Sequence, residues 1–255
     1  MTDDALLELG KQIYRYTRKF FIPPEYLFEI LEDQKVVPMI RGKAMEYNAY
    51  LFLKEHLPKM SWDVQKLNLN AQTGLHDEDI SITHRKSGII LKVESKSAVR
   101  GSIKDGKGRG KIKTPGFKVK CHRSRSNIKL AETSNDRYSM DSFDVLITTT
   151  ANAIYQGGTI GDDLEVVHKT GLREMLFEFY EVKTENDLKL RCECDWRFAI
   201  PKDIAEEGFI PRTPFVALED DPNWFSVDKL EARLLEVVNE KKAAQKKVHI
   251  ATRRS

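Results

Sequence analysis

The chain has 255 residues, and its 42 lysines and arginines are nearly balanced by 39 aspartates and glutamates, which leaves a formal net charge of +3. This length can form one large domain with a substantial core, and the small net charge excludes a uniformly basic protein that coats nucleic acid. No apolar run approaches the length needed to span a membrane, and the first residues, Met-Thr-Asp-Asp, lack the cationic start of a secretory signal. We therefore expect a soluble cytoplasmic protein that makes no contact with a membrane.

Two helices are predicted in the first quarter of the chain. The first covers residues 3 to 20 and is ended by the Pro23-Pro24 pair. Its apolar residues repeat at the spacing of one helix face, at Leu6, Leu9, Ile13 and Tyr16. The second covers residues 43 to 56 and stops near Pro58. Both helices are expected to belong to the scaffold of the domain.

Residues 77 to 96 have the alternation of a β-hairpin, with a polar turn at residues 84 to 88 that ends in glycine. Successive side chains of a strand point to opposite faces, so the isoleucines of the first strand share one face and Asp79 lies on the other. In the second strand, Glu94 and Lys96 also lie opposite the apolar residues. When the two apolar faces pack inward together, Asp79 and Glu94 converge, and Lys96 lies two residues beyond Glu94.

This grouping of two acids and an amine has a chemical consequence. Burying such groups side by side costs free energy unless they pair or hold a cation, and carboxylate oxygens suit a hard ion such as Mg²⁺. An ion placed there polarises a phosphate and lowers the pKa of a bound water, while a neighbouring lysine orients the attacking hydroxide. The hairpin therefore predicts a metal-dependent hydrolase of nucleic acid.

At Asp79 and at the triplet Glu94-Ser95-Lys96, the chain resembles the PD-(D/E)xK nuclease superfamily and, within it, the type II restriction endonucleases. The family places a proline before the aspartate, whereas this chain has Glu78, and the departure leaves Asp77 as a competing choice of first metal ligand. The run from Arg41 to Glu46 is similar to one that opens a helix in many such enzymes, with a glutamate that points at the metal site. Glu46 is the matching residue.

The resemblance covers residues 41 to 100, and it implies a fold for the whole chain. That fold is α/β, a single domain with a mixed central β-sheet flanked by helices. It would comprise a helical part in residues 1 to 40, a catalytic core in residues 41 to 200, and a C-terminal helix with a basic tail in residues 226 to 255. The resemblance also implies the prokaryotic cytoplasm and a cognate DNA methyltransferase in the same system, without implying a physical contact between the two proteins.

The resemblance further assigns roles to the site residues. Asp79 and Glu94, together with the carbonyl oxygen of Ser95, would hold Mg²⁺. Lys96 would position and activate the attacking water, and Glu46 would support the site from its helix or help to bind a second ion. No organic cofactor is expected.

A strongly basic segment follows the hairpin directly. Between Arg100 and Lys129 there are eleven lysines and arginines and one acid, Asp105. Five glycines and Pro115 argue against a long regular element up to residue 116. Affinity for phosphates needs several such charges together, so this segment is predicted to contact DNA. The predicted DNA-binding residues are Arg100, Lys104, Lys107, Arg109, Lys111, Lys113, Lys118, Lys120, Arg123 and Arg125.

The rest of the chain is expected to be scaffold. Residues 142 to 150 are rich in β-branched side chains and predict a central strand, and residues 195 to 200 predict another. Residues 227 to 247 predict a helix whose leucine stripe faces the core. A second triplet of the same form, Glu181-Val182-Lys183, follows a helical pattern and is predicted to be a surface ion pair. The three cysteines lack the spacing of a zinc site and are expected to be reduced.

Together these features predict a Mg²⁺-dependent type II restriction endonuclease that cuts double-stranded DNA at a specific sequence. A homodimer is expected, because a symmetric pair of subunits cuts both strands most simply. Two alternatives remain open. One is another nuclease of the same superfamily, acting in repair, as a resolvase or on methylated DNA. The other is a DNA-binding protein whose acidic cluster is only structural.

Overall fold

The structure is a computed structural model, and it describes residues 2 to 67, 79 to 107, 114 to 122, 136 to 156, 166 and 170 to 252. The helices are α1 (Asp3–Lys19), α2 (Leu27–Glu32), α3 (Val37–His56), α5 (Thr170–Phe179), α6 (Glu185–Cys194), α7 (Pro201–Ile204) and α8 (Leu230–Thr252). The strands are β1 (Trp62–Lys66), β2 (Ile80–His84), β3 (Ile89–Ser95), β4 (Gly116–Lys118), β5 (Val145–Thr149), β6 (Trp196–Ala199), β7 (Phe215–Ala217) and β8 (Trp224–Phe225). Short 3₁₀ helices are η1 (Pro24–Tyr26), η3 (Ala151–Ile154) and η4 (Val227–Lys229).

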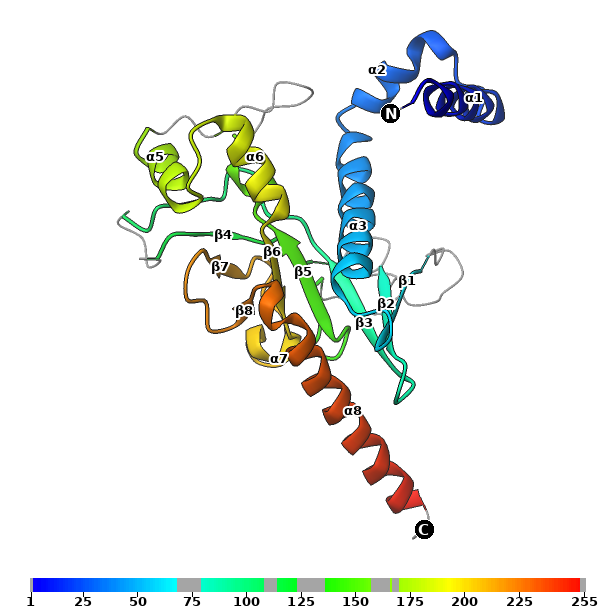
Figure 1. Ribbon diagram of the computed structural model, residues 1–255. Coiled ribbons are helices and arrows are strands. Elements are labelled where there is room, and N and C mark those ends of the chain that lie inside the picture. Colours follow the sequence, from blue (N-terminus) through cyan, green and yellow to red (C-terminus); the bar gives the residue numbers. More distant parts are fainter. Residues whose placement is uncertain are drawn as a thin grey trace.

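A mixed sheet with the strand order β1-β2-β3-β5-β6-β8 forms the centre of the domain (Figure 1). Strands β1, β2 and β3 are antiparallel neighbours, β3 and β5 run parallel, and β5, β6 and β8 are again antiparallel. The strands predicted at residues 142 to 150 and 195 to 200 are β5 and β6, and β5 has a neighbour on each side. The prediction of a single α/β domain with a mixed sheet flanked by helices is confirmed.

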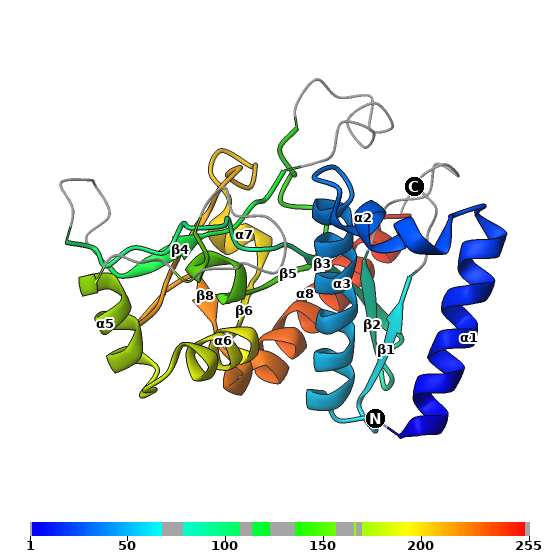
Figure 2. The same cartoon turned by 90° about the horizontal axis from the view of Figure 1, so that it is seen from above.

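The two faces of the sheet are covered by different helices, because alternate residues of each strand point to opposite sides. Ile147 of β5 lies in one buried cluster with Leu53 of α3 and Leu234 of α8. Leu146, the preceding residue, lies in a second cluster with Leu176 of α5. Figures 1 and 2 both place α5 and α6 at the opposite end of the molecule from α1.

Strands β2 and β3 form the predicted hairpin, with Ile80 opposite Val93 and His84 opposite Ile89. The turn closes through Gly88, whose N–H donates to the His84 carbonyl at 2.9 Å and whose φ is 68°. Glycine adopts this left-handed conformation without the steric cost that a Cβ would add. Continuing the register by one position beyond Ile80 and Val93 brings Asp79 opposite Glu94. The predicted hairpin is confirmed, and its register places the two acids opposite each other as expected.

The described parts of the basic segment after the hairpin form backbone pairs with each other and with β7. Strand β4 is antiparallel to β7, and isolated bridges join Ala98 to Val119 and Lys104 to Gly116. A Cβ built on Gly116 would lie 2.3 Å from the carbonyl oxygen of Val216, so only glycine allows β4 to approach β7 this closely.

The predicted terminal helices are present as α1 and α8, but only α8 is packed along its apolar stripe. Leu230, Leu234 and Val238 of α8 are buried, as expected. Helix α1 begins with Thr2, whose Oγ1 accepts the Ala5 N–H, and it has acidic residues in its first turn and basic residues in its last turn, which fits the helix dipole. Its predicted apolar face is exposed to solvent. Within the described ranges, none of the helices combines the length and the apolarity required to cross a membrane.

Candidate functional site

Asp79 and Ser95 lock the open end of the hairpin together. Oδ2 of Asp79 accepts the Ser95 backbone N–H and the Ser95 hydroxyl, each at 2.8 Å, and the Asp79 side chain is buried. Both bonds go to Oδ2 and neither goes to Oδ1, so the carboxylate is oriented through one oxygen. The metal-binding role expected for the Ser95 carbonyl stays a prediction, because the two contacts with Asp79 use the N–H and the hydroxyl of Ser95.

Glu94 is held in the same way, through its Oε1 atom. Oε1 accepts the Tyr138 hydroxyl at 3.0 Å and forms an ion pair with Nζ of Lys96. The Lys96 ammonium also lies 5.2 Å from the centre of the Tyr138 ring, which packs edge-on against Phe143. The structure therefore brings Asp79, Glu94 and Lys96 together as predicted. It adds Tyr138, whose hydroxyl donates to Glu94 and whose ring lies beside the Lys96 ammonium.

The ionisation of these groups is coupled. Burial, then the charges of Glu94 and Glu46, raises the pKa of Asp79 from 3.8 to about 7, while Lys96 and the Ser95 N–H act in the opposite direction. Burial by itself lowers the pKa of the Lys96 ammonium, but the charge of Glu94, with Tyr138 and Asp79, holds that pKa well above its usual range. Burial and Glu94 also raise the pKa of the Tyr138 hydroxyl, so it stays a neutral donor.

Glu46 lies near this site, held by two lysines. Its Oε2 accepts from Nζ of Lys66 at 2.8 Å and forms an ion pair with Nζ of Lys43 at 2.8 Å. The Lys66 ammonium is nearly buried and lies 4.9 Å from the centre of the Tyr47 ring. The charge of Glu46 reaches Asp79, since it raises the pKa of that carboxyl. Its proposed part in binding a second ion stays a prediction.

The carboxylates of this site suit a magnesium ion that keeps several water ligands better than a metal ion bound by protein side chains alone. Among the described residues, no group of three or more His, Cys, Asp or Glu side chains is arranged to hold a metal. Mg²⁺, however, usually takes only one or two carboxylates and keeps several waters. Asp79 and Glu94 supply two carboxylates, each with one oxygen fixed by protein donors, and a nearby cation would favour the ionised form of Asp79. Asp77 lies outside the described residues.

A cavity of about 720 Å³ opens beside the hairpin, between α3, the end of β5 and the end of α6. Ser97, the residue after Lys96, lines it, and so do Arg41 of α3 and Arg100. Burial, and then the charge of Arg41, lowers the pKa of Arg100, so the two guanidinium groups lie within electrostatic range of each other. Two like charges on one cavity wall favour an anion between them.

The predicted DNA-binding residues are placed unevenly. Lys104, Lys107 and Lys120 are exposed, while Arg100 and Lys118 are half-buried. The remaining five predicted residues lie outside the described residues: Arg109, Lys111, Lys113, Arg123 and Arg125.

Three contributors to the site were not predicted. Lys66 ends β1, a strand that the alternation of Trp62, Asp63, Val64 and Gln65 could have indicated. Tyr138 precedes β5 and is 44 positions from Glu94, so no local pattern connects the two. Arg41 belonged to the motif that was quoted for Glu46, but its side chain was given no role.

The second Glu-x-Lys triplet differs from the first in its surroundings. Glu181 and Lys183 are both exposed in the turn that follows α5, and Glu181 has a φ of 53°. They are not part of a strand in the described structure. The predicted surface position is confirmed, whereas the predicted ion pair between the two side chains is not found in the described part of the chain.

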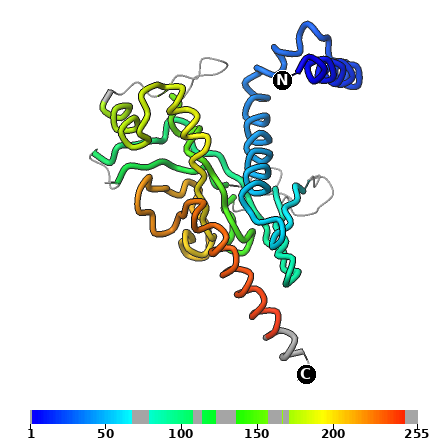
Figure 3. The backbone as a smooth tube through the Cα atoms, in the orientation of Figure 1, coloured from blue at the N-terminus to red at the C-terminus, as the bar shows by residue number. Residues whose placement is uncertain are grey.

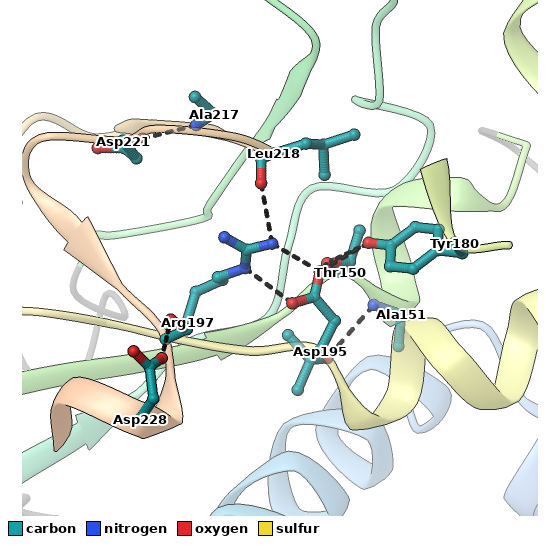
Figure 4. A network of polar contacts seen from close by, with 11 residues as sticks. Thr150, Ala151, Tyr180, Asp195, Arg197, Ala217, Leu218, Asp221 and Asp228 are labelled. Atoms are coloured by element: carbon teal, nitrogen blue, oxygen red, sulfur yellow. Dashed lines mark hydrogen bonds and ion pairs between the residues drawn. The ribbon is translucent and has the colours of Figure 1, made fainter. Parts of the chain in front are cut away.

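A separate polar network lies where α6 meets β6 (Figure 4). Oδ2 of Asp195 accepts the Thr150 hydroxyl at 2.5 Å and the Tyr180 hydroxyl at 2.6 Å. Arg197 donates to both carboxylate oxygens, at 2.8 Å from Nε and 3.2 Å from Nη2, and Nη2 also donates to the Leu218 carbonyl. All the neighbours of Asp195 in this network donate to it, which is the pattern of a structural carboxylate.

No family model matches the sequence, and no curated protein is similar to it in sequence. Among solved structures, that of a bacterial homing endonuclease, I-Ssp6803I, aligns with 85% of this chain and 98% of that chain, with 14% identity and a TM-score of 0.34. A TM-score of this size is too low to transfer a fold or an activity from one chain to the other. The function must therefore be argued from the residues of this chain.

Proposed function

We propose that the protein is a Mg²⁺-dependent endonuclease that hydrolyses phosphodiester bonds of double-stranded DNA. One observation carries this proposal: Asp79 and Glu94 lie across from each other at the open end of the β2-β3 hairpin, and Lys96 contacts Glu94. A pair of buried carboxylates with an adjacent amine is the arrangement that holds a hard cation beside a phosphate.

Each residue then has a distinct part in the reaction. Asp79 and Glu94, with the Ser95 carbonyl, would hold Mg²⁺, which when bound polarises the phosphate and lowers the pKa of a bound water. The Lys96 ammonium orients the attacking water and offsets the negative charge that develops on the phosphate. Tyr138 and Ser95 position the two carboxylates, because each donates to one oxygen and leaves the other oxygen to the cation.

The DNA strand would run from the hairpin into the neighbouring cavity. Arg41 and Arg100 line this cavity together with Ser97, so a phosphate near the reacting one lies within reach of two guanidinium groups. Glu55 and Glu193 also line the cavity, and they would oppose an anion placed near them. The strand is therefore expected to pass along the side formed by the arginines.

The more specific proposal is cleavage at a defined sequence by a homodimer, as in a type II restriction endonuclease. The motif resemblance at Asp79 and Glu94-Ser95-Lys96 supports this choice over a repair, resolvase or methylation-dependent nuclease. A methyltransferase that protects the host DNA is part of the same proposal. A DNA-binding protein without catalysis is the competing proposal, because the Glu94–Lys96 ion pair is also what a purely structural cluster would contain.

The test is DNA cleavage by purified protein on plasmid and phage DNA, methylated and unmethylated, with Mg²⁺ or with EDTA. Glu94→Ala and Lys96→Ala are the test variants, and Glu181→Ala and Lys183→Ala, from the exposed triplet of the same form, are matched controls. We expect discrete fragments with Mg²⁺ that disappear with EDTA and in the two test variants, and persist in the two controls. Smearing or structure-dependent nicking would favour another nuclease, and binding without cleavage would exclude the enzymatic function.

A further inference from the structure

Helix α1 presents an apolar stripe that stays exposed among the described residues. Leu6, Leu9, Ile13 and Tyr16 are between 40% and 55% exposed. Their spacing of three, four and three residues is that of the a and d positions of a coiled coil. The only buried residue of α1 is Thr17, so contact with the chain's own body does not involve the stripe. Figure 3 shows α1 and α2 as an arm that extends away from the α/β body beyond the N-terminal end of α3.

The exposed apolar side chains of this arm add up to the area of a protein–protein interface. Further large apolar residues of the arm and of the start of α3 are exposed, namely Leu7, Tyr14, Phe20, Phe21, Tyr26, Phe28, Ile30, Leu31, Met39 and Ile40. Because an aromatic side chain buries about 150–250 Å² when covered, these side chains expose on the order of 1,000 Å² together. Monomers rarely expose contiguous apolar patches above a few hundred Å², and each partner of a standard interface buries about 800 Å².

The pattern of the stripe indicates which partner covers it. Reversing the helix about its midpoint, near Lys11, exchanges Leu6 with Tyr16 and Leu9 with Ile13. An isologous contact requires that each residue meet its counterpart in this reversed order, and an antiparallel coiled coil places a positions opposite d positions. The stripe therefore complements a second copy of itself.

The charges of α1 follow the same reversal with opposite sign. Its first turn is acidic, with Asp3 and Asp4, and its last turn is basic, with Arg18 and Lys19. In an antiparallel pair the acidic end of each helix lies beside the basic end of the other, and the two helix dipoles oppose each other favourably. A parallel pair would place like charges together at both ends, so the charge pattern selects the antiparallel arrangement.

We propose that α1 is the dimer interface of this protein, where it packs antiparallel against α1 of a second copy about a two-fold axis near the middle of the helix. Helix α2 and the Phe20-Phe21 pair enlarge the contact at each end. This surface would hold two catalytic hairpins in one assembly, and it is inferred from α1 without reference to the nuclease activity.

The oligomeric state tests the surface. At micromolar chain concentration, light scattering after size exclusion is expected to give twice the chain mass for the unchanged protein and one chain mass for the double variant Leu9→Glu with Ile13→Glu. Leu190→Glu and Met60→Glu, which alter apolar residues that are 61% and 91% exposed elsewhere, are the controls and should remain dimeric. Circular dichroism of the double variant should show retained folding, because the altered side chains are exposed in the single chain.

Disulfide trapping tests the direction of pairing. In a Cys194→Ser background, Leu6→Cys and Tyr16→Cys are prepared separately and mixed. Their positions are about 15 Å apart along the helix, too far for a disulfide between identical positions of an antiparallel pair. A disulfide-linked dimer is therefore expected in the mixture and not in either variant alone.

The outcomes that overturn the proposal are distinct from those that overturn the nuclease. A monomeric wild-type protein, a dimeric Leu9→Glu/Ile13→Glu variant, or crosslinking of Leu6→Cys with itself would each exclude this interface. Loss of DNA binding by a monomeric protein on substitution of Arg15 and Arg18 would show that α1 contacts DNA instead. Failure of cleavage with an intact, α1-dependent dimer would remove the proposed function and leave the interface standing.

Discussion

Asp79 and Asp195 are both carboxylates within polar clusters, but the negative charge of the two side chains is balanced to different extents. Around Asp195, Arg197, Tyr180 and Thr150 are all donors, and the charge of the acid is balanced by a guanidinium that contacts both of its oxygens. Around Asp79, the donors found among the described residues are both from Ser95, and the nearby charges are two further acids, Glu94 and Glu46, opposed by Lys96.

The difference is the one expected between a structural cluster and the site proposed for catalysis. A buried carboxylate that serves the fold is surrounded by donors, because an unpaired charge in a low-dielectric interior is costly. Burial and neighbouring acids instead raise the pKa of Asp79 to about 7. The ionised carboxylate is therefore stabilised when a cation binds beside it, and without a cation it takes up a proton near neutral pH. The same residue types therefore have different uses depending on what the tertiary structure places beside them.

The largest expected effect is on catalysis, from Asp79→Asn. Loss of one metal-binding carboxylate is expected to lower Mg²⁺-dependent cleavage by roughly 10³-fold or more, while the chain stays folded. Plasmid cleavage rates and circular dichroism measure the two properties. Asp195→Asn, assayed where it is folded, should cleave within a few-fold of the unchanged protein. Equal losses in both variants would remove the distinction between the clusters.

The next effect is on stability, from Asp195→Ala. Removing this carboxylate leaves Arg197 without its ion partner and the Thr150 hydroxyl without its acceptor, while Tyr180 keeps Thr150 as an acceptor. The free energy of unfolding should therefore fall by about 3 kcal/mol. Urea unfolding gives this value. Tyr180→Phe, which removes one donor from the network, should cost only about 1 kcal/mol. A loss for Asp195→Ala no larger than that of Tyr180→Phe would contradict the structural assignment.

A smaller effect concerns pH, again at Asp79. Its pKa of about 7 in the folded chain lies above 3.8, so the folded chain binds this proton more tightly than the unfolded chain. In EDTA, the free energy of unfolding should therefore rise as pH falls from about 8 to about 5, by on the order of 2 kcal/mol relative to Asp79→Asn. Parallel pH profiles for the two proteins would show that the carboxyl of Asp79 is not perturbed.

The smallest effect is a difference in thiol reactivity. Burial raises the pKa of Cys121, near Glu94 and Lys96, and of Cys192, beside the Asp195 network, to about 12 in both cases. Cys194 is exposed. Iodoacetamide should modify Cys194 in the native protein, and it should modify Cys121 and Cys192 roughly 10³-fold more slowly. Peptide mass spectrometry measures the three rates. Rapid modification of Cys121 but not of Cys192 would indicate that the surroundings of Glu94 and Lys96 open more readily than the Asp195 network.

Much of the candidate site could be predicted because it lies on one hairpin. The period of two in a strand assigns Asp79 and Glu94 to the face opposite the apolar residues, and a buried apolar face permits only one register. Lys66, Tyr138 and Arg41 could not be connected to these residues. They reach the site from β1, from the segment before β5 and from α3, through contacts between elements that are distant in sequence.

The sequence by itself determined the local elements of this protein: the helix of residues 3 to 19, the hairpin with its two acids and lysine, the central strand, and the C-terminal helix. These follow from hydrophobic periodicity and turn chemistry, which act over a few residues. Only the tertiary structure decided which apolar faces are covered and which charges are compensated. The stripe of α8 is buried while that of α1 is exposed, and Asp195 is balanced while Asp79 is not, because burial and pairing depend on what the rest of the folded chain brings alongside.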